Sequence, residues 1–177
     1  MQKSALPEPW LRGTHNDIDP IRRGILHALD LCGEDASHWC KSLRDDQLLD
    51  RPAGLPPIVF HLRHIVRSLD RLLTYAEGKQ LSAAQLEALK SELDTSGLHP
   101  SSISEVFDEF RTGLRRAADR IRSIGPDRFH ESVHIGKKQL PATVGGLLVH
   151  CADHSQRHIG QLITTVKVLQ FTVPDRE

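Results

Sequence analysis

The sequence has no excess charge of either sign, no long apolar run and few cysteines. Its 23 lysines and arginines balance 23 aspartates and glutamates. This balance argues against nucleic-acid or anionic-membrane binding, because proteins with those partners normally carry a basic excess. No apolar stretch approaches the roughly 18 residues of a membrane span, and the N-terminal MQKSALPEPW lacks the apolar core of a secretory signal. We therefore expect a cytoplasmic protein without nucleic-acid or membrane partners.

The cysteine content argues against a disulfide framework, whereas the histidine content is high. The three cysteines, Cys32, Cys40 and Cys151, form no CxxC pair, and their odd number leaves at least one unpaired. A disulfide framework is therefore not expected. Histidine, by contrast, occurs 11 times in 177 residues. Such enrichment is typical of metal or proton chemistry, although drift in surface composition gives the same count.

Apolar residues at helical spacing predict a single all-α domain. The chain is long enough to bury a substantial core. The spacing predicts four long helices, at about 16–41, 57–77, 102–124 and 143–169. We interpret them as a four-helix bundle over residues 16–169. An N-terminal arm (1–15) and a C-terminal tail (170–177) flank the bundle.

The connections carry recognisable cap and turn signals. Asp19-Pro20 is typical of an N-cap followed by the first helical residue, and Ser102 and Glu105 have the spacing of a capping box. Residues 52–57 are predicted to be extended, because proline and its predecessor resist helix. A short amphipathic helix capped by Ser82 is predicted at 81–93. Residues 127–141 fit either a small hairpin or an irregular loop.

The most informative stretch is HCADHSQRHIGQ, residues 150–161, in the last predicted helix. His150, His154 and His158 recur every four residues, so their side chains project from one face, one turn apart. An inward-facing helix seam has a characteristic alternation of four- and three-residue steps. That spacing fits Leu147, Cys151, His154, His158 and Leu162. Two histidines thus interrupt an apolar row. Buried imidazoles need hydrogen bonds or a metal, and paired histidines one turn apart bind zinc in HExxH helices.

A third metal ligand is expected from the second helix. That helix offers His61 and His64 near its N-terminal end. Loops, or helix faces that look exposed, hold His15, His27, His38, His99, His130 and His134. Of these, His130 and His134 are placed to shape the mouth of a cavity.

These residues resemble the DinB/YfiT-like superfamily of metal-dependent enzymes. In that family a helix-two histidine, found here in Arg63-His64-Ile65, joins an HxxxH pair whose second histidine precedes Gly-Gln, as in residues 154–161. The resemblance covers about residues 16–169. It implies that His64, His154 and His158 are the metal ligands, with His61 as the alternative from helix two. His150 and Cys151 lie outside the family's ligand set, so each is either an outer neighbour of the site or an ordinary residue.

The resemblance also implies a function. Family members bind zinc, nickel or another divalent metal, many are homodimers, and some are S-transferases that use low-molecular-weight thiols. Three histidines leave a metal an open position, as catalytic sites require, and the metal would activate a thiol or a water molecule. We predict a thiol transferase or hydrolase acting on a small molecule. The alternative is a non-catalytic, stress-related binding bundle with a structural metal or none.

Three further residues are candidates for orienting the imidazoles or handling protons: Asp153, Gln161 and Tyr75. Asp153 alternatively faces solvent. Cys151 lies in the apolar row, which favours an inert buried thiol over a nucleophile. The outer face of the third long helix carries Arg111, Arg115, Arg116, Arg120 and Arg122. We favour solvated side chains balanced by nearby carboxylates over an anion site there.

Overall fold

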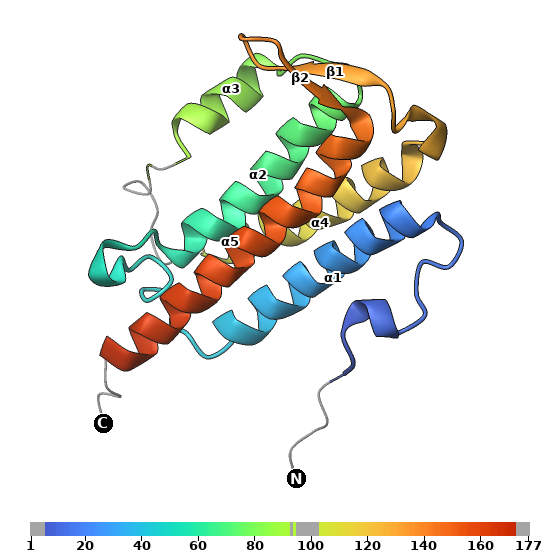
Figure 1. Ribbon diagram of the computed structural model, residues 1–177. Helices are drawn as coiled ribbons and strands as arrows, with labels where there is room; N and C mark the ends of the chain where they lie inside the picture. The colour runs from blue at the N-terminus through green and yellow to red at the C-terminus, as the bar shows by residue number, and fades with distance from the viewer. Residues whose placement is uncertain (1–5, 93, 95–102, 173–177) are drawn as a thin grey trace.

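The computed structural model describes residues 6–92, 94 and 103–172. In this part of the chain there are five α-helices and one two-stranded sheet (Figure 1). Their bounds are α1 Pro20–Cys40, α2 Ile58–Ala76, α3 Ala83–Lys90, α4 Ile103–Ser123, β1 Ser132–Ile135, β2 Leu140–Thr143 and α5 Val144–Thr172. The mostly helical architecture agrees with the predicted all-α class, and α3 is the short helix expected near residues 81–93.

The four long helices each contact two others. α5 packs against α1 and α2, and α4 packs against the same two helices from the other side. The short α3 contacts α2 and lies along its outer side (Figure 1). The β-hairpin sits at the end where α5 begins, and its first strand also contacts α2. The apolar stripes of the four long helices thereby meet in one core.

Helix α2 is the most enclosed of these elements, and most of its residues are buried. Its close approach to α4 depends on a glycine. A Cβ atom built at Gly113 of α4 would lie 2.5 Å from the Cβ of Val66, far inside the ~3.5–4.0 Å of a normal carbon contact. Only a residue without a side chain allows α4 to lie this close to α2.

The helix ends follow the predicted capping chemistry. The Asp19 side chain accepts hydrogen bonds from the backbone N–H groups of Ile21 and Arg22, so α1 begins at Pro20 and not at residue 16. Ser82 forms a full capping box with Gln85 at the start of α3. The predicted cap at residue 102 falls outside the described residues. Helix α5 continues to Thr172, so the first residues of the predicted C-terminal tail are helical.

Two connections needed the structure to define them. Residues Pro52–Gly54 form a 3-10 turn, so the prediction of a wholly extended connector was wrong. The turn is possible because Pro52 occupies its first position, where no N–H is needed, and because Ala53 and Gly54 adopt positive φ angles. Of the two alternatives for residues 127–141, the hairpin is present: Val133 pairs with Ala142 in an antiparallel register.

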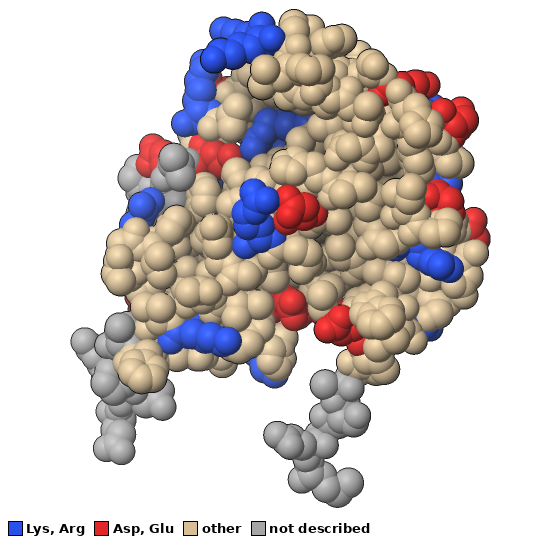
Figure 2. All heavy atoms as spheres, in the orientation of Figure 1, with Lys and Arg blue, Asp and Glu red and all other residues tan. Residues whose placement is uncertain are grey.

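The surface shows the charge balance of the sequence. On the face drawn in Figure 2, acidic and basic side chains are interspersed, with uncharged areas between them. None of the helices in the described ranges combines the length and apolar character that crossing a membrane requires.

Candidate metal centre

Three histidines from two helices meet between α2 and α5. His64 of α2 and His154 of α5 place their Nε2 atoms 3.0 Å apart. The ring of His158 lies 4.2 Å from that of His64 and 4.6 Å from that of His154, centre to centre. One ring nitrogen from each residue falls within 4.8 Å of the other two. The structure therefore brings together the three residues that the sequence resemblance implied.

The two α5 histidines lie at the border of the buried stripe of their helix. Cys151, Ser155 and Ile159 are almost fully buried, whereas His154 and His158 are only partly buried. The predicted seam placed these two histidines inside the apolar row, and the structure moves them to its edge. At this edge they face α2 while solvent still reaches them.

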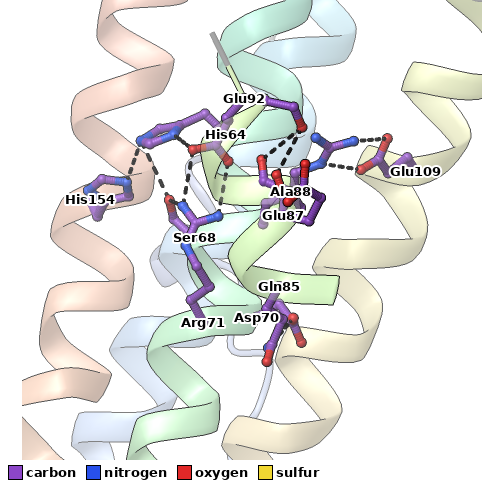
Figure 3. A network of polar contacts seen from close by, with 12 residues as sticks. His64, Ser68, Asp70, Arg71, Gln85, Glu87, Ala88, Glu92, Glu109 and His154 are labelled. Atoms are coloured by element: carbon purple, nitrogen blue, oxygen red, sulfur yellow. Dashed lines mark hydrogen bonds and ion pairs between the residues drawn. The ribbon is translucent and has the colours of Figure 1, made fainter. Parts of the chain in front are cut away.

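His64 is held in place by a buried carboxylate. Its Nδ1 lies 2.8 Å from Oε2 of Glu92, just beyond α3 (Figure 3). The guanidinium of Arg71 donates to both oxygens of Glu92, at 3.1 and 3.2 Å, and to the hydroxyl of Ser68 at 2.9 Å. Burial disfavours the charged carboxylate, but the bonds from His64 and Arg71 outweigh it and lower the pKa of Glu92. Glu92 is therefore an anion at neutral pH.

The contact with Glu92 assigns the tautomer of His64. An ionised carboxylate only accepts hydrogen bonds, so the His64 proton sits on Nδ1 and its Nε2 presents a lone pair. In the structure this lone pair accepts a hydrogen bond from Nε2 of His154. Many metal-binding histidines have a carboxylate on the nitrogen that does not bind the metal, because it fixes the ring and raises its basicity.

His61 stands behind His158. The Nδ1 atoms of the two rings are 3.3 Å apart, which leaves Nε2 of His158 as the nitrogen available to the cluster. His61 is only 1% exposed, and its Nε2 has no hydrogen-bond partner in the described part of the chain. Burial, followed by the nearby His158 and His64, lowers the pKa of His61 to about 4. His61 is thus a neutral neighbour of the cluster, whose three nitrogens come from other residues.

The cluster fits a divalent transition metal. Burial, together with the neighbouring His64 and Arg157, disfavours a proton on His154 and His158 and lowers the pKa of each to about 4, so both rings keep a lone pair at neutral pH. Tetrahedral zinc with bonds of ~2.0–2.1 Å requires nitrogens about 3.3 Å apart, close to the 3.0 Å between His64 and His154. Imidazole nitrogens are donors suited to zinc, nickel and related ions.

The other proposed site residues lie further out. Asp153 is exposed and pairs with Arg157 and His150. Gln161 lines a separate pocket together with His61 and Arg157. Tyr75 is buried eleven residues after His64 on α2, or about 16 Å along the helix at 1.5 Å per residue.

The remaining histidines include one that the sequence misplaced. His27, expected on an exposed face, is buried because the N-terminal arm folds over α1 and Thr14 bonds to its Nε2. His38, His130 and His134 are exposed, and none of them contacts the cluster. His99 lies outside the described residues. Cys151 is fully buried, and burial raises its pKa to about 12, as expected of an inert thiol.

Comparison with known families agrees with this geometry. The sequence model of the DinB superfamily matches residues 28–162, a segment that contains all three histidines of the cluster. This chain belongs to the DinB superfamily. No curated protein and no solved structure matches it significantly. Membership of the DinB superfamily therefore rests on the family match. The chemistry of this DinB-superfamily protein follows from its own residues.

Sequence reasoning found the cluster but missed its support. Glu92 follows a short helix, in a segment without periodicity, 28 residues after its partner His64. A single glutamate in such a segment carries no local signal of burial. Arg71, which pairs with Glu92, was likewise not singled out by sequence reasoning. Arg71 lies on the same helix as His64, and the packing of α3 on α2 brings Glu92 to both of them.

Proposed function

We propose that this DinB-superfamily protein is a metal-dependent enzyme acting on a small molecule by thiol transfer or hydrolysis. In this proposal His64, His154 and His158 hold a divalent transition metal, zinc or nickel. The supporting observation is the convergence of three imidazoles from α2 and α5, with the Glu92 anion behind one of them. A metal bound there would supply a lowered pKa for a coordinated water or thiol.

The chain's own residues would prepare the site. Glu92 and Arg71 fix the ring of His64, and the contact between His61 and His158 fixes a second ring. The partial burial of the α5 histidines leaves the cluster open to a small molecule. Three ligands rather than four also favour a catalytic site, because structural zinc sites are usually closed by a fourth protein ligand.

We further propose the wider properties implied by the family: a four-helix-bundle core, a cytoplasmic homodimer, and a low-molecular-weight thiol as one substrate. The balance of charges speaks against nucleic acid as a partner.

Metal content tests the ligand set. Purified wild-type protein should bind one equivalent of zinc or nickel, and His64→Ala, His154→Ala and His158→Ala should each lose it. His150→Ala is the matched control, because His150 is exposed on the same helix and pairs with Asp153. Full metal content in all three cluster variants would refute the proposed site.

A second measurement separates an enzyme from a non-catalytic bundle. Cobalt(II) loaded in place of the native metal reports its coordination through its visible spectrum. An open position predicts a new sulfur-to-cobalt charge-transfer band when 2-mercaptoethanol is added. A spectrum that does not respond to the thiol would indicate a closed site and favour the structural alternative.

A further inference from the structure

A second cavity of about 240 Å³ lies between α2, α3 and α4. None of the three clustered histidines lines it. Four arginines do: Arg67, Arg71, Arg116 and Arg120. The apolar part of its wall comes from Val66, Leu73, Ala88 and Ala117. The volume is just below the ~300–1,000 Å³ of drug-sized ligand sites, so it suits a compact molecule.

Three of the four arginines already have carboxylate partners. Arg67 pairs with Glu109 at 2.8 Å. Arg71 pairs with Glu92 at 3.1 Å (Figure 3), and Arg120 pairs with both Asp70 and Glu77. These ion pairs fill the cavity wall with charges of both signs and hold the three guanidinium groups in fixed positions.

Arg116 is different. It lines the same cavity while remaining exposed to solvent, and it makes no hydrogen bond or ion pair with the residues that the structure describes. Arg116 is therefore the one guanidinium of the wall without a carboxylate partner among these residues, because Arg120 holds two carboxylates. The expectation of a uniformly solvated arginine face holds for Arg111, which pairs with Asp108 in the open, but Arg116 and Arg120 turn one side of that face into a cavity wall.

Unused N–H donors accompany this charge. A guanidinium carries five donors. Arg71 directs three hydrogen bonds to Glu92 and Ser68, and Arg67 directs two to Glu109. The remaining donors of these arginines, and all five of Arg116, are free for a ligand. The planar fork of an arginine matches a carboxylate better than other anions of one charge.

We propose that this cavity binds a small organic monoanion, a compact apolar molecule that carries one carboxylate. The carboxylate meets Arg116 and the unused donors of Arg71, and the apolar body covers the wall formed by Val66, Leu73 and Ala117. The carboxylate of the ligand supplies the partner that Arg116 lacks, and one carboxylate is enough to do so. This site is separate from the histidine cluster and requires no metal.

Arg71 connects the two sites. It lines the cavity and also holds Glu92, which in turn holds His64. The positive charge of Arg71 disfavours a cation at the histidines, and an anion bound to Arg71 reduces that effect. Occupancy of the cavity therefore tightens metal binding, and the metal tightens anion binding by the same factor. This coupling rests on the proposed metal function, whereas the anion site does not.

Benzoate binding to the metal-free protein tests the site. Calorimetry or NMR titration should show saturable binding of benzoate, and benzyl alcohol, which has the same ring without the charge, should bind at least about tenfold more weakly. Arg116→Gln should weaken benzoate binding by about tenfold. Arg115→Gln, on the same helix but outside the cavity wall, should leave it unchanged. Equal binding of the two compounds, or an unaffected Arg116→Gln protein, would overturn the proposed site.

The coupling is tested by zinc titrations with and without saturating benzoate. Zinc affinity should rise about fivefold or more, and this rise should disappear in Arg116→Gln. Benzoate that binds without altering zinc affinity would overturn the coupling alone. The His158→Ala protein separates this proposal from the metal site, because His158 has no hydrogen bond to Glu92 or Arg71 in the described part of the chain, so this variant should bind benzoate normally while losing zinc. Loss of benzoate binding in that variant would show that the two sites are one.

Discussion

Replacing Glu92 with glutamine should weaken metal binding while leaving all three histidines in place. The change is nearly isosteric but removes the negative charge that accepts the hydrogen bond from His64 at 2.8 Å. A hydrogen bond to a charged group contributes about 1.5–3 kcal/mol. This range converts to roughly 10–100-fold in affinity at 1.4 kcal/mol per factor of ten. The same 10–100-fold loss is typical when an outer partner of a metal ligand is replaced.

The magnitude depends on the burial of the carboxylate. The side chain of Glu92 is only 4% exposed, so water cannot readily replace the lost charge. Arg71 keeps an acceptor in the glutamine oxygen, which limits damage to the fold. Zinc affinity should be measured by competition with a chromogenic chelator, alongside circular dichroism and urea unfolding of the metal-free proteins.

Glu87→Gln is the matched control. Glu87 lies on α3 and is 73% exposed, and among the described residues its side chain pairs only with Lys90, so its replacement should leave zinc affinity unchanged. A Glu92→Gln protein that folds normally and binds zinc like the wild type would refute the role assigned to this carboxylate. Equal losses in both variants would show a general effect of surface charge instead.

Three further outcomes are expected. Gly113→Ala should lower the free energy of unfolding by about 1–2 kcal/mol in urea titrations, because overpacking against Val66 outweighs the roughly 1 kcal/mol gain in helix propensity. Gly24→Ala is the control: Gly24 has open space around it, so this change should raise the free energy of unfolding by up to about 1 kcal/mol. A change of the same sign in both variants would be inconsistent with this packing. The metal-free protein should keep its full stability above about pH 6.5 and lose part of it as the pH falls towards 4. His61, His154 and His158 have lowered pKa values in the folded protein, so the same histidines take up protons first in the unfolded chain. A urea midpoint that stays constant between pH 7 and 4.5 would argue against these lowered pKa values. Cys151 should react with a thiol reagent only in denaturant, because burial raises its pKa; rapid labelling of the native protein at this position would contradict its burial.

Local patterns predicted much of the fold because they report local energetics. Asp19-Pro20 marks the start of α1 because the cap satisfies the first free N–H groups within the same few residues. His154 and His158 could be paired from sequence because helical geometry alone places them one turn apart. Their depth in the protein could not be predicted, because it depends on how α5 is rotated against its neighbours.

Features created by packing between distant segments could not be predicted from the sequence. The burial of His27 depends on an arm that folds back onto α1, and the bond between Glu92 and His64 depends on where α3 docks. The arginine cavity required three helices to meet. In each case the residues carried no periodic signal of their own, and their environment came from elements far away in the chain.

The sequence separation between the two ligand-bearing helices has a consequence for the unfolded protein. His64 and His154 are 90 residues apart, so an ion held by both closes a loop that contains half of the chain. In the chain-entropy treatment of cross-links, a loop of that length restricts the unfolded state by roughly 4–5 kcal/mol. A metal at this position would therefore act as a reversible cross-link. A chelator that removed it would let the unfolded chain expand, although no covalent bond is broken.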